Sequence, residues 1–250
     1  MPMKNFFELY DALIEGVASD EAVTGTLMGQ CWTAVETEHT FGMAMTTPVD
    51  TAPRMLTGDY TGKTLRELAV VCKSWNLTEA GFGMAAVNAF YNTPERLEVL
   101  NAFEPFDHYC TEGLDLRGKR IGVIGHLNMP PSIREQAKEI FILERSPRPG
   151  DYPDSACDWL LPQCDVVIMT ASTLVNKTLP HLLELCENAY TILAGPTCPM
   201  CPELLDLGLD RIAGLVITDR AGMGHKIIHE IPGPPYNMGK PFLLRRNAHE

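Results

Sequence analysis

The sequence is short of positive charge, with 20 Lys and Arg residues against 32 Asp and Glu residues and a formal net charge of -12. No run of basic residues is longer than two, as in the RR of residues 245–246. A nucleic-acid-binding surface normally needs a basic patch or stripe. We therefore expect no nucleic acid among its partners, and the acidity mainly favours solubility.

Long apolar runs are also missing, and no segment is apolar enough over the length needed to cross a bilayer. The first 23 residues carry an acidic residue every few positions, which interrupts the apolar core that a signal peptide needs. We therefore expect a cytoplasmic protein with no membrane contact. In such a protein the eight cysteines are expected to be free thiols or metal ligands instead of disulfides.

Neither an internal repeat nor a low-complexity tract divides the chain, but its first half has a pattern of its own. The apolar spacing within 4–17 predicts a helix, and the Thr- and Val-rich residues 23–50 predict two or three antiparallel strands. Two further helices are expected at 62–75 and at 78–92, and the small residues of the second would let another backbone approach closely. Strands followed by helices indicate a compact α+β unit.

The pattern changes near residues 112–118, which we take as a domain boundary that separates residues 1–115 from residues 116–250. In the second part, short strands that are apolar throughout alternate with helical segments. That alternation is typical of a parallel α/β sheet with helices on both faces. The predicted strands are 119–126, 140–145, 165–172, 190–196 and 211–219.

Local signals predict three further features of the fold. Thr78 should N-cap the helix that it opens, and Ser132 with Glu135 should form a capping box at the start of another. The stretch PFLLRR follows an irregular Pro- and Gly-rich segment at 231–241, and it is expected to add one edge strand to the large sheet.

The ends of the predicted strands contain the main candidates for ligand binding, because ligands of open parallel sheets bind beyond the carboxyl ends of the strands. The dinucleotide fingerprint G-x-G-x-x-G is missing from GVIGH at the end of the first strand. Glu144 nevertheless follows Gly125 by 19 residues, near the place of a ribose-binding acid. Glu144 could therefore hold a nucleotide-like ligand, or it could be a strand-end carboxylate paired with a neighbour.

The third predicted strand ends in TASTLVN, whose hydroxyl and amide groups suit a phosphate, a carboxylate or another anion. Turn and helix-cap chemistry explains the same residues equally well. The candidate ligand-binding residues at the strand ends are Gly125, His126, Glu144, Thr170, Ser172, Thr173, Asn176, Thr197 and Asp219.

Three weaker candidates come from the first half of the chain. Glu36 and His39 lie close together in VETEHTFG, where they could bind a hard metal or act as acid and base. A solvated strand face with a hairpin tip is the favoured explanation of both residues. Asn88, within the helix predicted at 78–92, is a further candidate for contact with a ligand.

Cys198 and Cys201 form a C-x-x-C pair between the fourth strand and the next helix, and no second C-x-x-C exists. A helix N-terminus lowers a thiol pKa, so a redox-active thiolate is one interpretation. A transition-metal site is another, with His225 and His229 as further ligands for Zn or another soft metal. The structural alternatives are a proline-stiffened turn and an exposed helix that carries two histidines.

Several stretches together resemble a family described as "putative heavy-metal chelation", formerly a domain of unknown function. They are GFGMAAVNAF, GKRIGVIGH, ILERSPRPGDYP, LPQCDVVIMTASTLVNKTL and AGPTCPMCPELLDLGLDRIAGLVITD. The resemblance covers most of the chain. It implies an N-terminal domain similar to the enolase N-terminal fold, a C-terminal Rossmann-like domain, a site in the cleft between them, and a homodimer as one arrangement of the subunits.

One stretch departs from the family pattern. The loop after the fourth strand usually reads Gly-Pro-Ser-Thr-Pro-Leu-Ser-Pro, whereas this chain has GPTCPMCP. Cys198 therefore stands where the family tends to have Thr, and Cys201 where it has Ser. Either this chain has gained a soft-metal site, or cysteine replaces a small hydroxyl residue.

The leading functional hypothesis is that the cleft binds a metal ion, or a small anionic or metal-bearing ligand. The alternative is an enzyme that acts on a nucleotide-like or phosphorylated small molecule through the strand ends. The sequence names neither the ligand nor a reaction, and a transition metal is the expected cofactor under the first hypothesis.

Overall fold

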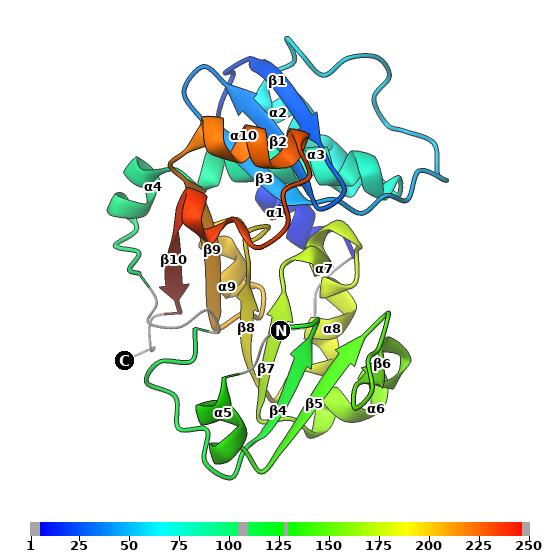
Figure 1. Ribbon diagram of the computed structural model, residues 1–250, viewed down its shortest axis with the longest axis vertical. Coiled ribbons are helices and arrows are strands. Elements are labelled where there is room, and N and C mark those ends of the chain that lie inside the picture. The colour runs from blue at the N-terminus through cyan, green and yellow to red at the C-terminus, as the bar shows by residue number, and fades with distance from the viewer. Residues whose placement is uncertain (1–5, 105–109, 128–129, 247–250) are drawn as a thin grey trace.

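The computed structural model describes residues 6–104, 110–127 and 130–246, and it contains two β-sheets, one above the other in Figure 1. The upper sheet has three antiparallel strands in the order β1-β2-β3, formed by Val23–Met28, Trp32–Thr37 and Phe41–Met45. The lower sheet has seven strands in the order β10-β9-β8-β7-β4-β5-β6. Within the described residues, no helix combines the length and the apolar character needed to cross a bilayer.

The large sheet is parallel from β9 to β6, and β10 pairs with β9 in the antiparallel direction. The five predicted strands and the predicted edge strand are confirmed. The two-residue strand β6 at the opposite edge was not expected. The seven strands are β4 (Arg120–Ile124), β5 (Glu139–Glu144), β6 (Tyr152–Pro153), β7 (Val166–Thr170), β8 (Tyr190–Ala194), β9 (Arg211–Ile217) and β10 (Gly239–Arg245).

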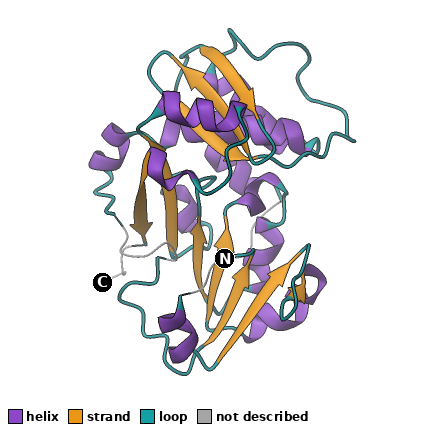
Figure 2. Cartoon of the chain, viewed as in Figure 1, coloured by secondary structure: helices purple, strands orange, loops and turns teal. Residues whose placement is uncertain are grey.

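Helices flank the large sheet, and their apolar side chains pack against strands that are apolar throughout. One face is covered by α6, α8 and α9, and the other by α5 and the segment around residues 110–116 (Figure 2). The bounds are α5 (Pro131–Gln136), η2 (Asp154–Ala156), α6 (Cys157–Leu160), η3 (Leu161–Gln163), α7 (Ser172–Val175), α8 (Leu179–Leu185), α9 (Glu203–Asp206), α10 (Arg220–Ile228) and η4 (Pro235–Met238).

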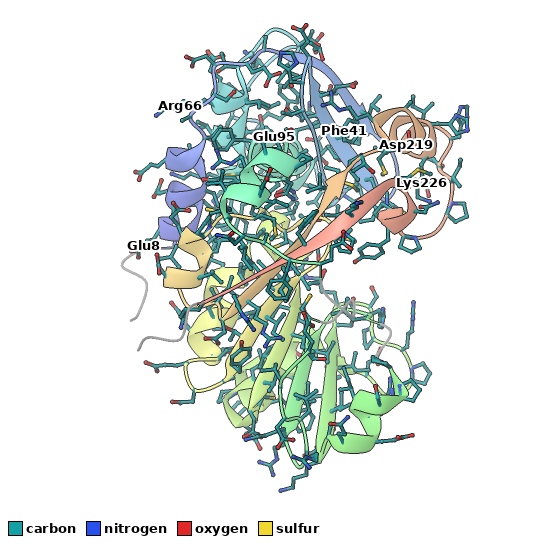
Figure 3. All side chains as sticks on the ribbon, turned by 90° about the vertical axis from the view of Figure 1, so that its left-hand side faces the viewer. Glu8, Phe41, Arg66, Glu95, Asp219 and Lys226 are labelled. Atoms are coloured by element: carbon teal, nitrogen blue, oxygen red, sulfur yellow. The ribbon has the colours of Figure 1, made fainter. Side chains whose placement is uncertain are left out.

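The small sheet lies between α3 on one face and α10 on the other. Gly42 and Ala44 of β3 face α3, whereas Phe41 and Met43 join Met223 of α10 in one apolar cluster, because successive strand residues point to opposite faces. Figure 3 shows Phe41 beside α10. The remaining elements of this half are α1 (Glu8–Gly16), α2 (Leu65–Ala69), η1 (Val70–Lys73), α3 (Leu77–Tyr91) and α4 (Pro94–Val99).

Since α10 belongs to the second half of the sequence yet covers the small sheet, the two halves share apolar clusters. Helix α3 is buried almost all round, which is typical of a helix in the interior of a protein. It contacts β2, β3, α2, η1 and α7. The boundary near residue 115 stays a prediction.

Three local predictions were wrong in detail. Helix α3 begins one residue before Thr78, and the Asn76 side chain caps it by accepting from Glu79 N at 3.0 Å. The capping box of Ser132 and Glu135 does not form, because α5 starts at Pro131 and Pro130 occupies the N-cap position. The helix expected at 62–75 is divided into α2 and the 3-10 helix η1.

Residues 46–64 form a long connection with no helix or strand, and Glu79 of α3 holds it. The fully buried Glu79 carboxylate accepts the backbone N–H groups of Met55 at 2.7 Å and Leu56 at 2.8 Å. Asn76 donates to the Ala52 carbonyl at 2.9 Å and also bonds Asp50. Since connections of this length are uncommon without a specific anchor, Glu79 should control the order of the segment.

Glu79→Ala should lower the free energy of unfolding by about 2 to 4 kcal/mol, because it removes the buried charged acceptor of two partly buried N–H groups. It should also make residues 46–64 sensitive to protease. Urea denaturation and limited proteolysis measure the two effects, with the exposed Glu98→Ala on α4 as the control. Equal stability of the two variants would show that Glu79 does not hold the connection.

Candidate functional site

A pocket of about 250 Å³ opens at the carboxyl ends of β4, β5 and β7, and Met45 and Thr47 at the end of β3 also line it. The strand order reverses between β4 and β7, and such a switch point is where open α/β sheets bind ligands. The lining residues are Met45, Thr47, Ile124, Gly125, Leu143, Glu144, Arg145, Asp154, Cys157, Asp158, Thr170, Ser172, Thr173, Asn176, Thr178, His181 and Leu182.

Gly125 lines the pocket at a position where a side chain would clash with the neighbouring strand. Its φ of +102° is a conformation that residues with a side chain rarely adopt. A Cβ atom at this position would lie 2.9 Å from Cγ2 of Thr170 on the neighbouring strand. Glycine therefore lets the ends of β4 and β7 approach each other where the strand order reverses.

The β7 side of the pocket carries hydroxyl and amide groups. The hydroxyls of Thr170 and Ser172 lie 3.2 Å apart, and Thr173 donates to the Thr170 carbonyl at 2.7 Å. Asn176 Oδ1 accepts from both the backbone N–H and the hydroxyl of Thr178, at 3.1 and 2.6 Å. The predicted turn chemistry thus accounts for Thr173 and part of Asn176, while Thr170, Ser172 and the Asn176 NH₂ group can serve a ligand.

The opposite side of the pocket carries an excess of negative charge, with three carboxylates against one guanidinium. Asp158 lies 3.0 Å from Nε2 of His181, and Asp154 lies 3.7 Å from Nε of Arg145. Glu144 accepts the backbone N–H groups of its neighbours, including His126 at 3.2 Å and Arg145 at 2.7 Å. Glu144 therefore organises the loop after its own strand as well as facing the pocket.

His126 lies next to the pocket without lining it. Its Nε2 atom is 2.7 Å from Oδ2 of Asp151, and its Nδ1 atom is 3.7 Å from Oε1 of Glu144. The Arg148 backbone N–H and the His126 ring, both hydrogen-bonded to Asp151, hold the pKa of that carboxyl below its usual range. The pair fixes the loop that follows β5.

Cys157 is the thiol of the pocket. It is 5% exposed, and burial first, then the neighbouring Asp154 and Asp158, raise the pKa of the thiol to about 11. At neutral pH the thiol keeps its proton, so Cys157 can offer a soft sulfur atom but is not an activated nucleophile.

Cys198 and Cys201 lie elsewhere, in a loop clamped between α3 and β9. Asn92 of the α3 C-cap donates to the Cys198 carbonyl at 2.9 Å and accepts from Met200 N at 2.9 Å. Both cysteines are 0% exposed, and burial raises the pKa of both thiols, that of Cys201 to about 12. Burial thus outweighs any lowering by the following helix, which disfavours a redox-active thiolate.

The four residues of the predicted transition-metal constellation are not gathered into one site. Over residues 6–104, 110–127 and 130–246, no group of three or more His, Cys, Asp or Glu side chains could hold a metal ion. His225 lies on α10 and His229 at its C-cap, beside the small sheet, and the two cysteines lie in the loop after β8. The physical reason is that α10 turns away from the large sheet to cover β1 and β2.

Thr197 and Asn88 lie together, but in the contact between α3, β3 and the loop after β8 and not in the pocket. Asn88 donates to the carbonyls of Met43 and Thr197, at 2.7 and 3.0 Å, and the Thr197 hydroxyl accepts from Met45 N at 2.9 Å. Because Met45 lines the pocket, these bonds fix the small sheet above it.

Glu36, His39 and Asp219 do not line the pocket. Glu36 and His39 belong to the β2–β3 hairpin, where His39 N donates to Glu21 at 2.9 Å. Asp219 caps α10 by accepting from Gly222 N at 2.8 Å. Their roles as ligand-binding or catalytic residues stay predictions.

Sequence reasoning missed four residues of the pocket, three that follow β5 and one that follows β7. Asp154, Cys157, Asp158 and His181 come from η2, α6 and α8, and they meet only because α6 packs against α8. The available signal was their position after a strand end. The strand-end rule covers only the residues next to the end of each strand, such as Glu144 at the end of β5.

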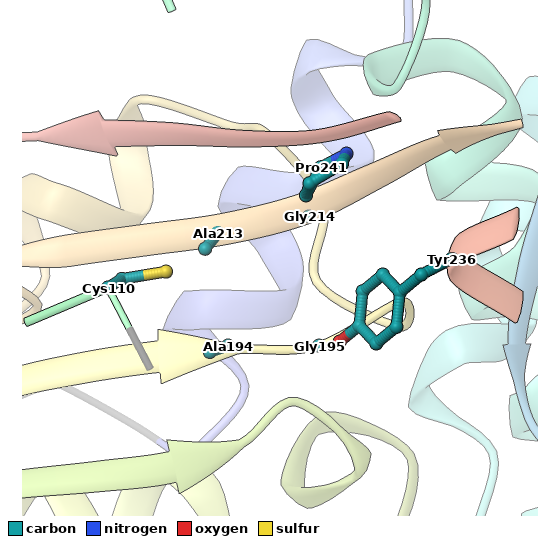
Figure 4. Close-up of a pocket in the computed structure, with 7 residues that line it drawn as sticks. All are labelled: Cys110, Ala194, Gly195, Ala213, Gly214, Tyr236 and Pro241. Atoms are coloured by element: carbon teal, nitrogen blue, oxygen red, sulfur yellow. The ribbon is translucent and has the colours of Figure 1, made fainter. Parts of the chain in front are cut away.

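A second cavity lies between β8, β9 and Tyr236, on the other side of the sheet centre (Figure 4). In Figure 4 the Tyr236 hydroxyl points toward Gly195. The cavity measures about 10 Å³, which is room for one water molecule and not for a ligand.

The mostly parallel seven-stranded sheet, flanked by helices and carrying a pocket at its strand ends, makes this a Rossmann-like α/β protein with an added small antiparallel sheet. The chain belongs to the DUF364 family, whose description is "putative heavy-metal chelation" and whose model matches residues 112–231. The DUF4213 model, with the same description, matches residues 10–91. The family named by the sequence resemblance is confirmed.

Two solved structures are similar over nearly the whole chain. A DUF364-family protein of unknown function from Desulfitobacterium hafniense is 32% identical, with a TM-score of 0.85 over 98% of this chain and 100% of that one. A second, from Pyrococcus horikoshii, is 25% identical, with a TM-score of 0.78 over 96% and 99%. An uncharacterized protein of Methanocaldococcus jannaschii is 32% identical over 172 residues, which are 63% of this chain and 62% of that protein.

Proposed function

We propose that the pocket at the ends of β4, β5 and β7 binds a small metal-bearing ligand. The observation that carries the proposal is its lining, in which hydroxyl and amide groups face three carboxylates and a protonated thiol. Carboxylates favour a cation, and hydroxyl and amide groups can bond the polar groups of the molecule that carries it. The family description points to the same chemistry.

A ligand that carries its metal suits the pocket better than a bare ion. The described lining offers no group of three or more side chains arranged to hold a metal, so the missing ligands must come with the metal. The volume of about 250 Å³ is at the small end for a ligand site, which fits a compact chelate.

A phosphorylated or nucleotide-like substrate has less support. Arg145 is the one guanidinium in the lining, and it already faces Asp154. The Glu144 carboxylate already accepts hydrogen bonds from backbone N–H groups of the neighbouring loops, so it is less available to bind the hydroxyl groups of a ribose. None of the eight cysteines, all of which lie in the described residues, is in a disulfide, which supports the cytoplasm as the setting of this activity.

Double substitution Asp154→Asn with Asp158→Asn should weaken binding of the metal-bearing ligand at least about tenfold, or about 1.4 kcal/mol, because it removes two of the three carboxylates. Metal analysis and native mass spectrometry of untagged protein measure what copurifies. Added ligand at 100 times Kd should stabilise the wild type by about 2.7 kcal/mol.

The matched control is Asp206→Asn, an exposed carboxylate on α9 outside the pocket, which should retain metal and ligand like the wild type. Equal metal content in all three proteins would contradict the proposal. Copurification of a metal-free nucleotide would favour the enzyme hypothesis instead.

A further inference from the structure

Two exposed histidines stand one turn apart near the end of α10. His225 and His229 are at i and i+4, and such residues lie on one face of a helix. Their ring centroids are 4.2 Å apart with an angle of 50° between the ring planes. The two imidazoles are therefore already neighbours, although the pocket of the proposed function does not include them.

Both rings are available to a ligand. Within the described chain, neither ring forms a hydrogen bond or an ion pair with a protein group. The Lys226 ammonium between them is buried and donates to the Pro232 carbonyl at 2.8 Å, and the Glu230 carboxylate accepts from Gln30 at 2.8 Å. The rings also lie at the carbonyl end of the helix, where the helix dipole favours positive charge.

We propose that His225 and His229 form a bidentate site for a divalent transition-metal ion, separate from the pocket at the strand ends. Metal–nitrogen bonds of about 2.0 to 2.1 Å place the two ligand nitrogens about 3 Å apart, which rings this close reach by side-chain rotation. Imidazole ligands suit Cu, Ni and Zn.

The site is open on one side. No third His, Cys, Asp or Glu joins the pair among the described residues, so water or a small ligand completes the coordination. His225 also borders a groove of about 460 Å³, together with Gly222, Tyr236 and the Pro- and Gly-rich residues 231–234. The groove leaves room for such a ligand beside the metal.

Titration of untagged, EDTA-treated full-length protein with Cu²⁺ and Ni²⁺ in a calorimeter tests the proposal. The wild type should bind one ion, with Cu²⁺ tighter than Ni²⁺. His225→Asn and His229→Asn should each weaken binding at least about tenfold, because either change removes the chelate. The double variant should be little worse than either single one, and acidification should weaken wild-type binding because protons compete for the nitrogens.

His39→Asn, which changes an exposed histidine on the β2–β3 hairpin, should leave the affinity unchanged. The pocket variant Asp154→Asn with Asp158→Asn should also leave it unchanged, so the two sites are tested independently. Since both α10 rings are exposed, their variants should melt like the wild type without metal. The same Cu²⁺ and Ni²⁺ affinity in the double variant, or wild-type binding weaker than about 1 mM, would overturn the proposal.

Discussion

Gly83→Ala should destabilise the protein by at least about 2 kcal/mol, whereas Gly81→Ala on the same helix should stabilise it by about 0.4 to 1 kcal/mol. A Cβ atom on Gly83 would lie 2.1 Å from the backbone nitrogen of Cys72 and 2.6 Å from the Val71 carbonyl carbon. Backbone atoms cannot relieve such a clash by changing rotamer, as a side chain can, so α3 and η1 would have to move apart. A Cβ atom on Gly81 would meet nothing closer than 3.6 Å.

Urea denaturation of the two variants measures this difference, because both start from a buried glycine in α3 and add the same methyl group. The gain at Gly81 comes from the lower entropy of the unfolded chain. A result in which both substitutions stabilise would mean that η1 can move away from α3 at little cost. That outcome would contradict the close backbone contact.

Lys177→Met should stabilise the protein at pH 7 by roughly 3 kcal/mol. Lys177 is 4% exposed, and its ammonium has one hydrogen bond, to the Val175 carbonyl at 3.0 Å. Burial lowers the pKa of Lys177 to about 8, so folding at pH 7 must bury its charge at a cost of roughly 3 kcal/mol. Methionine has a similar shape and no charge. Like lysine it carries a Cβ atom, so the backbone strain at the positive φ of this position is the same in both proteins.

The gain should depend on pH. Below pH 8 the lysine is charged in both the folded and the unfolded state, so folding bears the full free-energy cost of burying the charge. Between pH 8 and 10.5 the unfolded chain binds more protons than the folded one, so wild-type stability rises relative to the variant and the difference shrinks.

Buried cysteines such as Cys72, whose pKa burial raises to about 12, act in the opposite direction above pH 9. Both proteins carry the same cysteines, so subtraction of the two stability curves removes this effect except at Cys72, whose thiol interacts electrostatically with Lys177. Lys138→Met, at an exposed position, is the control and should change stability little at any pH. A constant difference between wild type and Lys177→Met from pH 7 to 10.5 would refute the buried-charge explanation.

Most of the fold could be predicted from the sequence, because the signals are local. The five apolar runs became β4, β5, β7, β8 and β9, since strands covered on both faces need apolar residues throughout. The small residues of α3 predicted a close backbone contact, and Gly83 makes it with Cys72. Helix starts were less certain, since several residues of one turn can supply the cap, and Asn76 took the role given to Thr78.

Only part of the pocket could be predicted in the same way. The strand-end rule selected Gly125, Glu144 and the hydroxyl residues that follow β7, and all of these line it. Asp154, Cys157 and His181 could not be selected, because their positions depend on how α6 and α8 pack and not on any local pattern.

By itself, the sequence determined which segments are strands, which of their ends carry polar groups, and to which family the chain belongs. The tertiary structure alone decided that GPTCPMCP is a buried contact, because Asn88 of α3 and Asn92 at its C-cap bond backbone groups of the loop. Its two cysteine sulfurs are then without access to solvent. It also decided that α10 covers the small sheet, which separates His225 and His229 from both cysteines. Strand ends are local properties of a chain, whereas burial and proximity arise only when distant segments pack.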